Sequence, residues 1–322
     1  MKTLKIADIE IKNRYVQAPL AGYTNFSMRE MGRRYGAGLT YTEMTSSTAL
    51  VYGNKRTFDM IPNAFEQGPV AFQLFGGKKE DIIKSIPLAE NYGKYDILDF
   101  NAGCPVKKVI KQEAGSFWLT REEELYDLAR AMVEVSSKPV TFKIRLGYTS
   151  EEKNYLKVAK VLEAAGVSAI AVHGRTRAQM YCGETDYDAI REIKESVSIP
   201  IIASGNINLD NFNDIDKIIS ADGYMFGRAS IGNPKIFEDL INLENGDSIR
   251  EYTKEEKMDD IVTHLNLLID EVGEVTACKL MRGFAVMYLK GLRNIRPYKN
   301  ELVQACTKKE YMEALDKIKN ND

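Results

Sequence analysis

The sequence predicts a (β/α)8 barrel followed by a domain made only of helices. Eight short apolar runs rich in β-branched residues alternate with longer segments whose apolar residues recur at helical spacing, and no strand pattern follows residue 245. Parallel strands need long, usually helical, connections, and eight such units close into a barrel of about 250 residues. The 322 residues, 44% of them hydrophobic, suffice for one large and one small domain. We expect the barrel in residues 1–245 and the helical domain in residues 246–322.

The eight predicted strands are bounded by turn residues or by helical patterns. They are residues 15–22, 39–46, 69–76, 97–104, 139–147, 169–175, 200–207 and 223–230. The intervening segments include residues 122–137 and residues 151–166, and the second of these ends on Gly166, a suitable helix C-cap. A doubly wound open sheet is the alternative, which is less favoured because no G-x-G-x-x-G follows the first strand.

The C-terminal segment differs from the rest in charge. A polar stretch, LENGDSIREYTKEEK, leads into three helical patterns, and residues 279–319 hold ten Lys or Arg against four Asp or Glu, whereas the whole chain has a net charge of −2. By default such a local excess is a solvated helix face. Arg282, Lys290 and Arg293 become candidate RNA contacts only through the family resemblance described below.

Other features narrow the class of protein. The N-terminus has no apolar signal-peptide region and no run of eighteen apolar residues occurs, so we expect no membrane segment and a cytoplasmic location. The four cysteines lie far apart and only two histidines are present, which disfavours a metal site. We expect a monomer without bound metal.

The ends of the predicted strands carry the polar residues, and in this fold the active site lies at those ends. Buried polar groups need partners, so the ring predicts a bound polar ligand. These strand-end positions are Pro19, Ala21, Glu43, Gln73, Asn101, Cys104, Lys143, Arg145, His173, Arg175, Ser204–Asn206, Gly227 and Arg228.

A phosphate site is predicted after the last two strands, where this fold usually binds phosphate. Gly205 and Gly227 can bring bare backbone N–H groups to an anion, and Arg228 adds charged donors. Lys143 suits negative charge on a ring, or else a salt bridge with Asp99. His173 suits a ligand contact, or else a satisfied interior position.

Several motifs in one order resemble the tRNA-dihydrouridine synthases, most of all their bacterial B-type branch. They are APLAGYTN (18–25), PVAFQLFG (69–76), DFNAGCPVKKV (99–109), FKIRLG (142–147), VHGRTRAQMYCG (172–183), ASGNI (203–207) and GYMFGRASIGNP (223–234). The likeness runs from about residue 5 to 245, with a weaker continuation at residues 281–292. It implies a barrel that binds FMN tightly and uses NADPH to reduce the C5–C6 double bond of selected uridines in RNA. The substrate is expected in the tRNA D-loop, with 23S ribosomal RNA as the alternative.

The resemblance also implies a role for each matching residue. Those expected to hold the flavin are Pro19, Leu20 and Ala21 along its length, Gln73, Lys143 and His173 at its ring system, and Ser204, Gly205, Asn206, Gly227 and Arg228 at its phosphate. Those expected to meet the RNA are Asn101, which would orient the uracil, and Arg175, Thr176 and Arg177.

Cys104 is the expected proton donor. Hydride delivered from the flavin to uracil C6 leaves negative charge at C5 and O4, and an acid on the opposite face must protonate C5. A thiol with a pKa near about 8.5 is protonated at neutral pH yet acidic enough to donate. Gly103 and Pro105 hold it on a turn, and Lys107 and Lys108 suit an RNA backbone.

The sequence departs from the B-type pattern in two places. Ser204 and Asn206 replace the usual Asn and Asp at the phosphate site, and Gly283, Phe284 and Met287 replace Lys, His and Trp in the C-terminal segment. The second set leaves the RNA class open. Two other functions are alternatives: a flavin-dependent small-molecule reductase of the dihydroorotate dehydrogenase type, and a non-catalytic RNA-binding relative.

Overall fold

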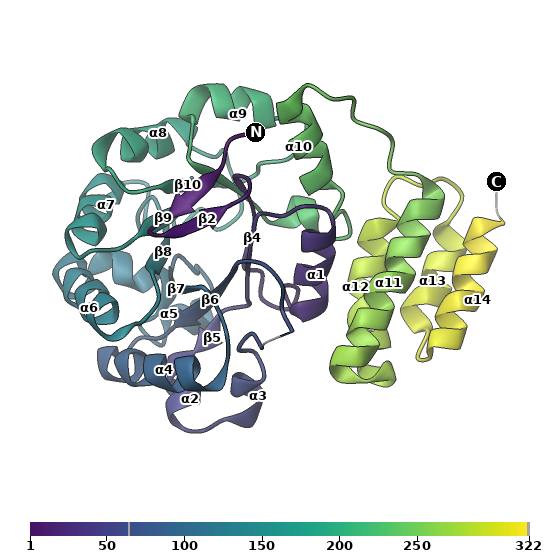
Figure 1. Cartoon of the computed structure of the whole chain (residues 1–322), viewed down its shortest axis with the longest axis horizontal. Helices are drawn as coiled ribbons and strands as arrows, with labels where there is room; N and C mark the ends of the chain where they lie inside the picture. The colour runs from purple at the N-terminus through teal and green to yellow at the C-terminus, as the bar shows by residue number, and fades with distance from the viewer. Residues whose placement is uncertain (64, 321–322) are drawn as a thin grey trace. The chain divides into compact units, whose positions relative to one another are not determined.

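The structure, a computed structural model, describes residues 1–63 and 65–320 and contains a closed parallel barrel (Figure 1). Neighbouring strands pair in parallel around the ring, and β11 pairs with β3 from Tyr224 opposite Tyr15 to Phe226 opposite Gln17, which closes it. The predicted fold class and all eight predicted strands are therefore confirmed. In order, the strands are β3 (Tyr15–Gln17), β4 (Leu39–Tyr41) with β5 (Thr45–Ser46), β6 (Val70–Phe75), β7 (Ile97–Ala102), β8 (Val140–Arg145), β9 (Ala169–His173), β10 (Ile201–Ser204) and β11 (Gly223–Phe226).

The second barrel strand is interrupted, where the sequence predicts one strand over residues 39–46. Tyr41 lies opposite Ala71 and Thr45 lies opposite Leu74, so the β4–β5 side holds one residue more than β6. At the interruption the Thr42 hydroxyl accepts the Gln73 backbone N–H at 3.0 Å, in place of a ladder carbonyl. The extra residue bends the chain at the carboxyl end of the strand, as β-bulges do.

Helices surround the barrel (Figure 1), and each buries its apolar residues on one face, as α6 (Glu122–Val135) does. In α6 the buried residues are Leu125, Leu128, Ala129 and Met132, the three- and four-residue spacing of one helix face. Three glutamates in its first turn, Glu122–Glu124, interact favourably with the positive end of the helix dipole and so stabilise the start of the helix. The other elements between barrel strands of this part are α2 (Ser47–Val51), α3 (Lys55–Phe58), α4 (Lys79–Tyr92), α5 (Lys107–Ile110), a 3-10 turn (Gly115–Thr120), α6 (Glu122–Val135), α7 (Tyr155–Ala164), α8 (Tyr187–Ser196) and α9 (Phe212–Ile219).

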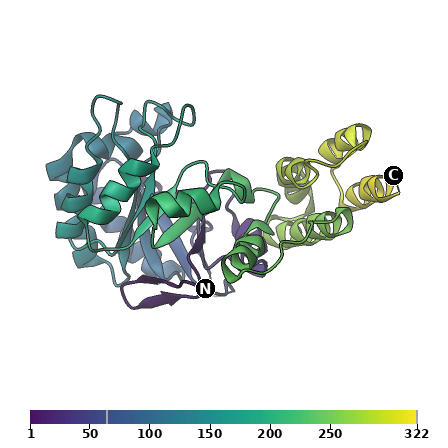
Figure 2. The same ribbon diagram turned by 90° about the horizontal axis from the view of Figure 1, so that it is seen from above.

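An antiparallel hairpin of β1 (Leu4–Ile6) and β2 (Ile9–Ile11) covers the end at which the barrel strands begin (Figure 2). Leu4, Ile6 and Ile11 are at most 1% exposed and belong to one apolar cluster with barrel residues such as Val16 and Leu39. This end of the barrel is therefore closed by hydrocarbon. This hairpin lies outside the eight strands predicted from the sequence.

The chain divides into two compact units, residues 1–24 with 37–227 and residues 25–36 with 228–322. The barrel lies in the first unit, and the second is helical throughout its regular structure. The predicted helical C-terminal region is present, and the helix between β3 and β4 groups with it. The predicted boundary after residue 245 stays a prediction. The second unit contains α1 (Phe26–Arg34), a 3-10 turn (Arg228–Ser230), α10 (Ile236–Asn245), α11 (Lys254–Val272), α12 (Glu274–Tyr288), α13 (Arg296–Gln304) and α14 (Lys308–Lys319).

The second unit has its own core. The Glu271 carboxylate in α11 accepts the backbone N–H groups of Phe26 and Ser27 at 3.2 and 3.1 Å, which ties α1 to α11. His264 is buried with its ring centroid 4.4 Å from that of Phe284, and burial lowers its pKa to about 3, so it is neutral. Phe284, one of the departures from the B-type pattern, is thus a core residue of this unit.

No helix in the described part of the chain is long and apolar enough to cross a membrane. Nor do residues 1–63 and 65–320 gather three His, Cys, Asp or Glu side chains that could hold a metal ion.

Candidate active site at the barrel mouth

The turn that carries Cys104 is fixed by main-chain hydrogen bonds. It follows β7, and the N–H groups of Gly103 and Cys104 both donate to the Asn101 Oδ1, at 3.1 and 2.8 Å. The Cys104 carbonyl accepts the Ser116 N–H at 3.1 Å. Gly115, at φ +63°, passes so close that a Cβ there would lie 2.7 Å from that carbonyl. The half-buried thiol therefore stands on a rigid support.

The surroundings of the thiol keep it protonated. Burial raises the pKa of the Cys104 thiol, whereas a hydrogen bond from the Val106 backbone and the positive charges of Arg145 and Lys143 act in the opposite direction. Because an ordinary cysteine already titrates near about 8.5, a raised pKa leaves the proton on sulfur at neutral pH. Such a group can donate a proton to a bound substrate.

A chain of buried polar side chains runs from the barrel interior to this turn. Asp99 accepts hydrogen bonds from the Thr141 hydroxyl and the Gln73 Nε2, both at 2.7 Å, and the Gln73 Oε1 accepts the Asn101 Nδ2 at 2.9 Å. Burial raises the pKa of Asp99 to about 7. Each amide is thereby oriented by the next. Gln73 and Asn101 remain predicted ligand contacts, and in this structure both amides are engaged within the protein.

Lys143 is a cation without a partner at the barrel mouth. It lies on β8 opposite Asn101 of β7, is half-buried, and forms no salt bridge or hydrogen bond with any residue in the described ranges. Burial, together with the nearby charge of Arg145, lowers its pKa to about 8, although Asp99 acts in the opposite direction. The alternative, a salt bridge with Asp99, is not formed. An amine in this state suits a negatively charged group of a ligand.

The glycines after β10 and β11 differ in what the fold demands of them. Gly205 has φ +120°, a conformation that only glycine adopts freely, and its carbonyl accepts the Tyr187 hydroxyl at 2.9 Å. Gly227 has no such conformation, and a Cβ there would meet nothing closer than the Leu20 Cδ2 at 3.6 Å. Neither packing nor conformation requires glycine at position 227, and its part in a phosphate site stays a prediction.

The other predicted phosphate residues have modest roles within the protein. The Ser204 hydroxyl donates to the Val172 carbonyl at 3.2 Å. Asn206 is in the left-handed region at φ +52°, and its carbonyl accepts the Asn211 Nδ2 at 2.8 Å. Arg228 is the first residue of the second unit. Their contact with a phosphate stays a prediction.

The loop after β9 holds the predicted RNA residues in unequal environments. Arg175 is buried and donates to the Gly183 carbonyl through Nε and Nη2, at 3.1 and 2.8 Å. Thr176 is also buried and bonds to Gln179 within the same loop. Arg177 is half-exposed, with its guanidinium 5.0 Å from the Tyr148 ring centroid. Of the three, Arg177 is the most accessible to a nucleic acid.

The remaining predicted residues lie on loops or helix surfaces. Pro19 and Leu20 are half-buried and Ala21 is exposed in the loop after β3, where the Leu20 N–H donates to the Thr24 hydroxyl at 2.8 Å. Four of the predicted RNA contacts are exposed. Lys107 and Lys108 lie at the start of α5, and Lys290 and Arg293 lie after α12. Arg282 is half-buried and points its guanidinium at the Ala305 carbonyl, 3.4 Å away. His173 is half-buried, with its ring 6.4 Å from that of Tyr181.

Sequence reasoning placed Arg145 at a strand end without a role, and the structure places it at the centre of the site. It is 3% exposed and donates to three backbone carbonyls on two loops. No local pattern distinguishes this arginine from one that reaches solvent.

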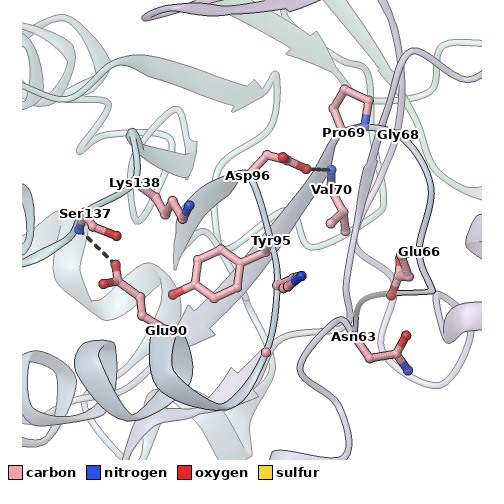
Figure 3. A pocket seen from close by; sticks show the side chains of 12 residues that line it. Asn63, Glu66, Gly68, Pro69, Val70, Glu90, Tyr95, Asp96, Ser137 and Lys138 are labelled. Atoms are coloured by element: carbon pink, nitrogen blue, oxygen red, sulfur yellow. Dashed lines mark hydrogen bonds between the residues drawn. The ribbon is translucent and has the colours of Figure 1, made fainter.

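A cleft of about 660 Å³ lies at the other end of the barrel, where β6, β7 and β8 begin (Figure 3). Its carboxylates serve the backbone: Glu90 accepts the Ser137 N–H at 2.9 Å and Asp96 accepts the Val70 N–H at 2.8 Å. Tyr95 is 4% exposed, with its hydroxyl buried in the wall. The described lining includes two lysines, Lys94 and Lys138, but no cysteine, so we place the reaction at the mouth, where the Cys104 thiol lies.

Comparison with known proteins points to one family. The family model described as "Dihydrouridine synthase (Dus)" matches residues 16–322. A protein of Pasteurella multocida (strain Pm70) named "tRNA-dihydrouridine synthase B" is 34% identical over 315 residues, 97% of this chain and 95% of that protein. A protein of Vibrio vulnificus (strain CMCP6) with the same name is 35% identical over 289 residues, 89% of each chain.

Solved structures share the barrel at much lower identity. The chain in "Crystal structure of TcOYE with pHBA" superimposes with a TM-score of 0.57 at 13% identity, covering 79% of this chain and 95% of that one. The chain in "Structure of morphinone reductase in complex with tetrahydroNAD" gives a TM-score of 0.53 at 16% identity, covering 80% of this chain and 93% of that one. At these identities the likeness shows the fold alone.

Proposed function

Because this chain belongs to the dihydrouridine synthase family, we propose that it reduces the C5–C6 double bond of specific uridines in tRNA, with FMN as bound cofactor and NADPH as reductant. The observation that carries the proposal is the pairing of a protonated thiol, Cys104, with an unpartnered amine, Lys143, at the mouth of the barrel. A small-molecule reductase of the dihydroorotate dehydrogenase type is less favoured, because the family match continues through the helical unit to residue 322.

The residues at the mouth fit a flavin. Lys143 would offer positive charge to the ring system, Gln73 and His173 would contact the same ring system, and the loop of Pro19, Leu20 and Ala21 would supply apolar surface. Ser204, Gly205, Asn206, Gly227 and Arg228 are the groups that would hold the phosphate. When bound, FMN supplies the hydride that uracil C6 accepts.

The protein's own contribution to the chemistry is the proton. The Cys104 S–H bond breaks as a C5–H bond forms on the uracil, and a thiolate remains. That thiolate regains a proton from water before the next turnover. The hydrogen bonds that fix the Cys104 turn reduce the motion needed at the moment of transfer, which is how positioning lowers a barrier.

The proposed reaction is tested with the purified protein, NADPH, and tRNA from cells that lack the corresponding gene. We expect dihydrouridine at defined D-loop positions, detected as a gain of two mass units in mapped fragments. In parallel, 23S ribosomal RNA from the same cells tests the alternative substrate. Reduction of ribosomal RNA alone would overturn the choice of tRNA, and reduction of neither would overturn the proposed function.

Substitution of Gly227 by alanine tests the phosphate site. We expect the melting temperature to change little, because the added Cβ meets nothing closer than 3.6 Å, whereas FMN retention falls by about tenfold or more as the methyl group crowds the phosphate. Fluorescence of released flavin measures the affinity. An unchanged melting temperature in the same variant is the control, because it shows that a loss of FMN does not come from a loss of fold. Unchanged FMN affinity in Gly227→Ala would contradict the assignment.

A monomeric state, a cytoplasmic location and a preference for NADPH over NADH remain predictions. The RNA contacts at Asn101, Lys107, Lys108, Arg175, Thr176, Arg177, Arg282, Lys290 and Arg293 are proposed with them. A non-catalytic RNA-binding relative is disfavoured by the thiol and the amine at the mouth, which RNA binding alone does not need.

A further inference from the structure

Arg145, the last residue of β8, is a buried cation with no acidic partner. Its Nε donates to the Gly103 carbonyl at 2.8 Å, and its Nη1 donates to the carbonyls of Thr176 and Met180 at 2.8 and 2.7 Å. The guanidinium lies 5.4 Å from the Tyr181 ring centroid. In the described part of the chain no carboxylate lies within salt-bridge distance of it. One side chain thus joins the Cys104 turn to the loop after β9.

An arginine in this position is costly to the folded protein. Burial of a charge without an opposite charge is unfavourable even when carbonyl dipoles surround it. Burial lowers the pKa of Arg145 to about 10, so it stays positive at neutral pH. Neutral donors could also hydrogen-bond to the three carbonyls. The link between the Cys104 turn and the loop after β9 therefore does not by itself explain why the side chain at this position carries a permanent charge.

An anion formed during the reaction accounts for it. Arg145 contacts the carbonyl of the residue directly before Cys104, and its charge lowers the pKa of that thiol. When the thiol donates its proton, negative charge appears on sulfur beside a cation that is already in place. Preorganised charge of this kind stabilises a developing anion without reorganisation.

We propose that Arg145 is a positioning residue of the reaction, which ties the Cys104 turn to the loop of residues 175–183 and stabilises the thiolate left after proton donation. The inference rests on the proposed function, in which Cys104 is the acid. Arg145 would thus hold the Cys104 turn in place and also stabilise the negative charge on sulfur. Different substitutions of Arg145 can separate these two roles.

The other charged or polar groups around the thiol are accounted for as follows. Lys143, also on β8, is a second cation that lowers the thiol pKa, and the Val106 N–H donates a hydrogen bond to the sulfur from the chain after the turn. On the far side of Arg145 stand Tyr181, which favours its charge, and Arg175, which opposes it. Asp99 interacts with Lys143 and does not figure among the groups that shift the thiol pKa.

The test is the pH dependence of Cys104 alkylation by iodoacetamide in the flavin-loaded protein, followed on the Cys104 peptide by mass spectrometry. Only the thiolate reacts, so the midpoint of the rate reports the thiol pKa without any need for activity. In Arg145→Met we expect the midpoint to rise by about one pH unit, because an opposite charge is lost. Dihydrouridine formation falls by about 10²-fold, since charge and tie are both removed.

Arg145→Lys separates the two roles. A lysine keeps the positive charge, so the alkylation midpoint should stay near that of the unsubstituted protein. A lysine cannot hydrogen-bond to three carbonyls as the planar guanidinium does, so turnover should fall by about tenfold. Arg130→Met is the charge control, because Arg130 is exposed on α6 and forms its salt bridge with Glu134 on the same helix. It removes the same charge and should leave both readouts unchanged.

An unshifted alkylation midpoint in Arg145→Met overturns the electrostatic role, and full turnover in Arg145→Lys overturns the tie. Should the methionine variant fail to retain flavin, Arg145→Gln, which keeps hydrogen-bond donors without charge, gives the same midpoint test. If Cys104→Ala remains active, the proposed acid is wrong, yet the alkylation midpoints still decide whether Arg145 lowers the thiol pKa. The two failures are therefore distinguishable.

Discussion

Cys104→Ala is expected to lower dihydrouridine formation by about 10²–10⁴-fold, the usual contribution of a positioned acid, while the protein keeps its flavin and its fold. The turn is held by the main-chain groups of Gly103 and Cys104, which alanine retains, and the side chain adds only a half-buried sulfur. The measurement is single-turnover reduction of tRNA, with dihydrouridine quantified by mass spectrometry. The flavin absorbance spectrum checks that the cofactor site is intact.

Cys182→Ala is the matched control for this substitution. Cys182 is an exposed cysteine on the loop after β9, in the same unit as Cys104. It should retain full activity. If both variants retain activity, the proton comes from another group or from solvent, and the assignment of Cys104 fails while the family membership stands.

Charge reversal at Lys290 and Arg293 is the second substitution with a large expected effect. Both side chains are exposed at the end of α12, in the segment with ten cations and four acidic residues. If both contact phosphates, Lys290→Glu with Arg293→Glu weakens tRNA binding by about 10- to 100-fold at low salt. The slope of log K against log salt then falls by about 1.5, which corresponds to two lost phosphate contacts. Filter binding over a salt series measures both quantities.

The same double variant should oxidise NADPH at an unchanged rate without RNA, because the substituted residues lie in the helical unit and the proposed flavin site is built largely from the barrel. Lys84→Glu with Lys160→Glu is the control, since it changes the net charge equally on exposed positions of α4 and α7. Equal loss of affinity in the two double variants would indicate a general charge effect and would count against a specific patch.

Much of the barrel was predictable because its signals are local. Each strand is a short β-branched run, and each surrounding helix repeats its apolar residues on one face, as α6 does with Leu125, Leu128 and Met132. The hairpin at residues 4–11 was overlooked, although LKIADIEI alternates in polarity around a tight turn. The interruption after Tyr41 and the grouping of α1 with the C-terminal helices depend on contacts between distant segments, which no local pattern reports.

The types of residue in the candidate site could be predicted from the sequence, but the hydrogen bonds that join them could not. Cys104 and Lys143 stand out as a thiol and an amine at strand ends, and the fold explains why these ends meet. That Asn101 orients the Cys104 turn through its Oδ1 and receives its own orientation from Gln73 follows only from the structure. Arg175 and Thr176 were expected beside RNA, and both are buried, because polar residues at a strand end can serve the loop that follows.

The β1–β2 hairpin has a consequence for the order of events in turnover. Because hydrocarbon closes the end of the barrel at which the strands begin, a substrate of the proposed reaction would reach Cys104 from the opposite end, where the strands finish. In that reaction a substrate seated over Cys104 would also stand between the sulfur and bulk solvent, so the thiolate would regain its proton after the product leaves.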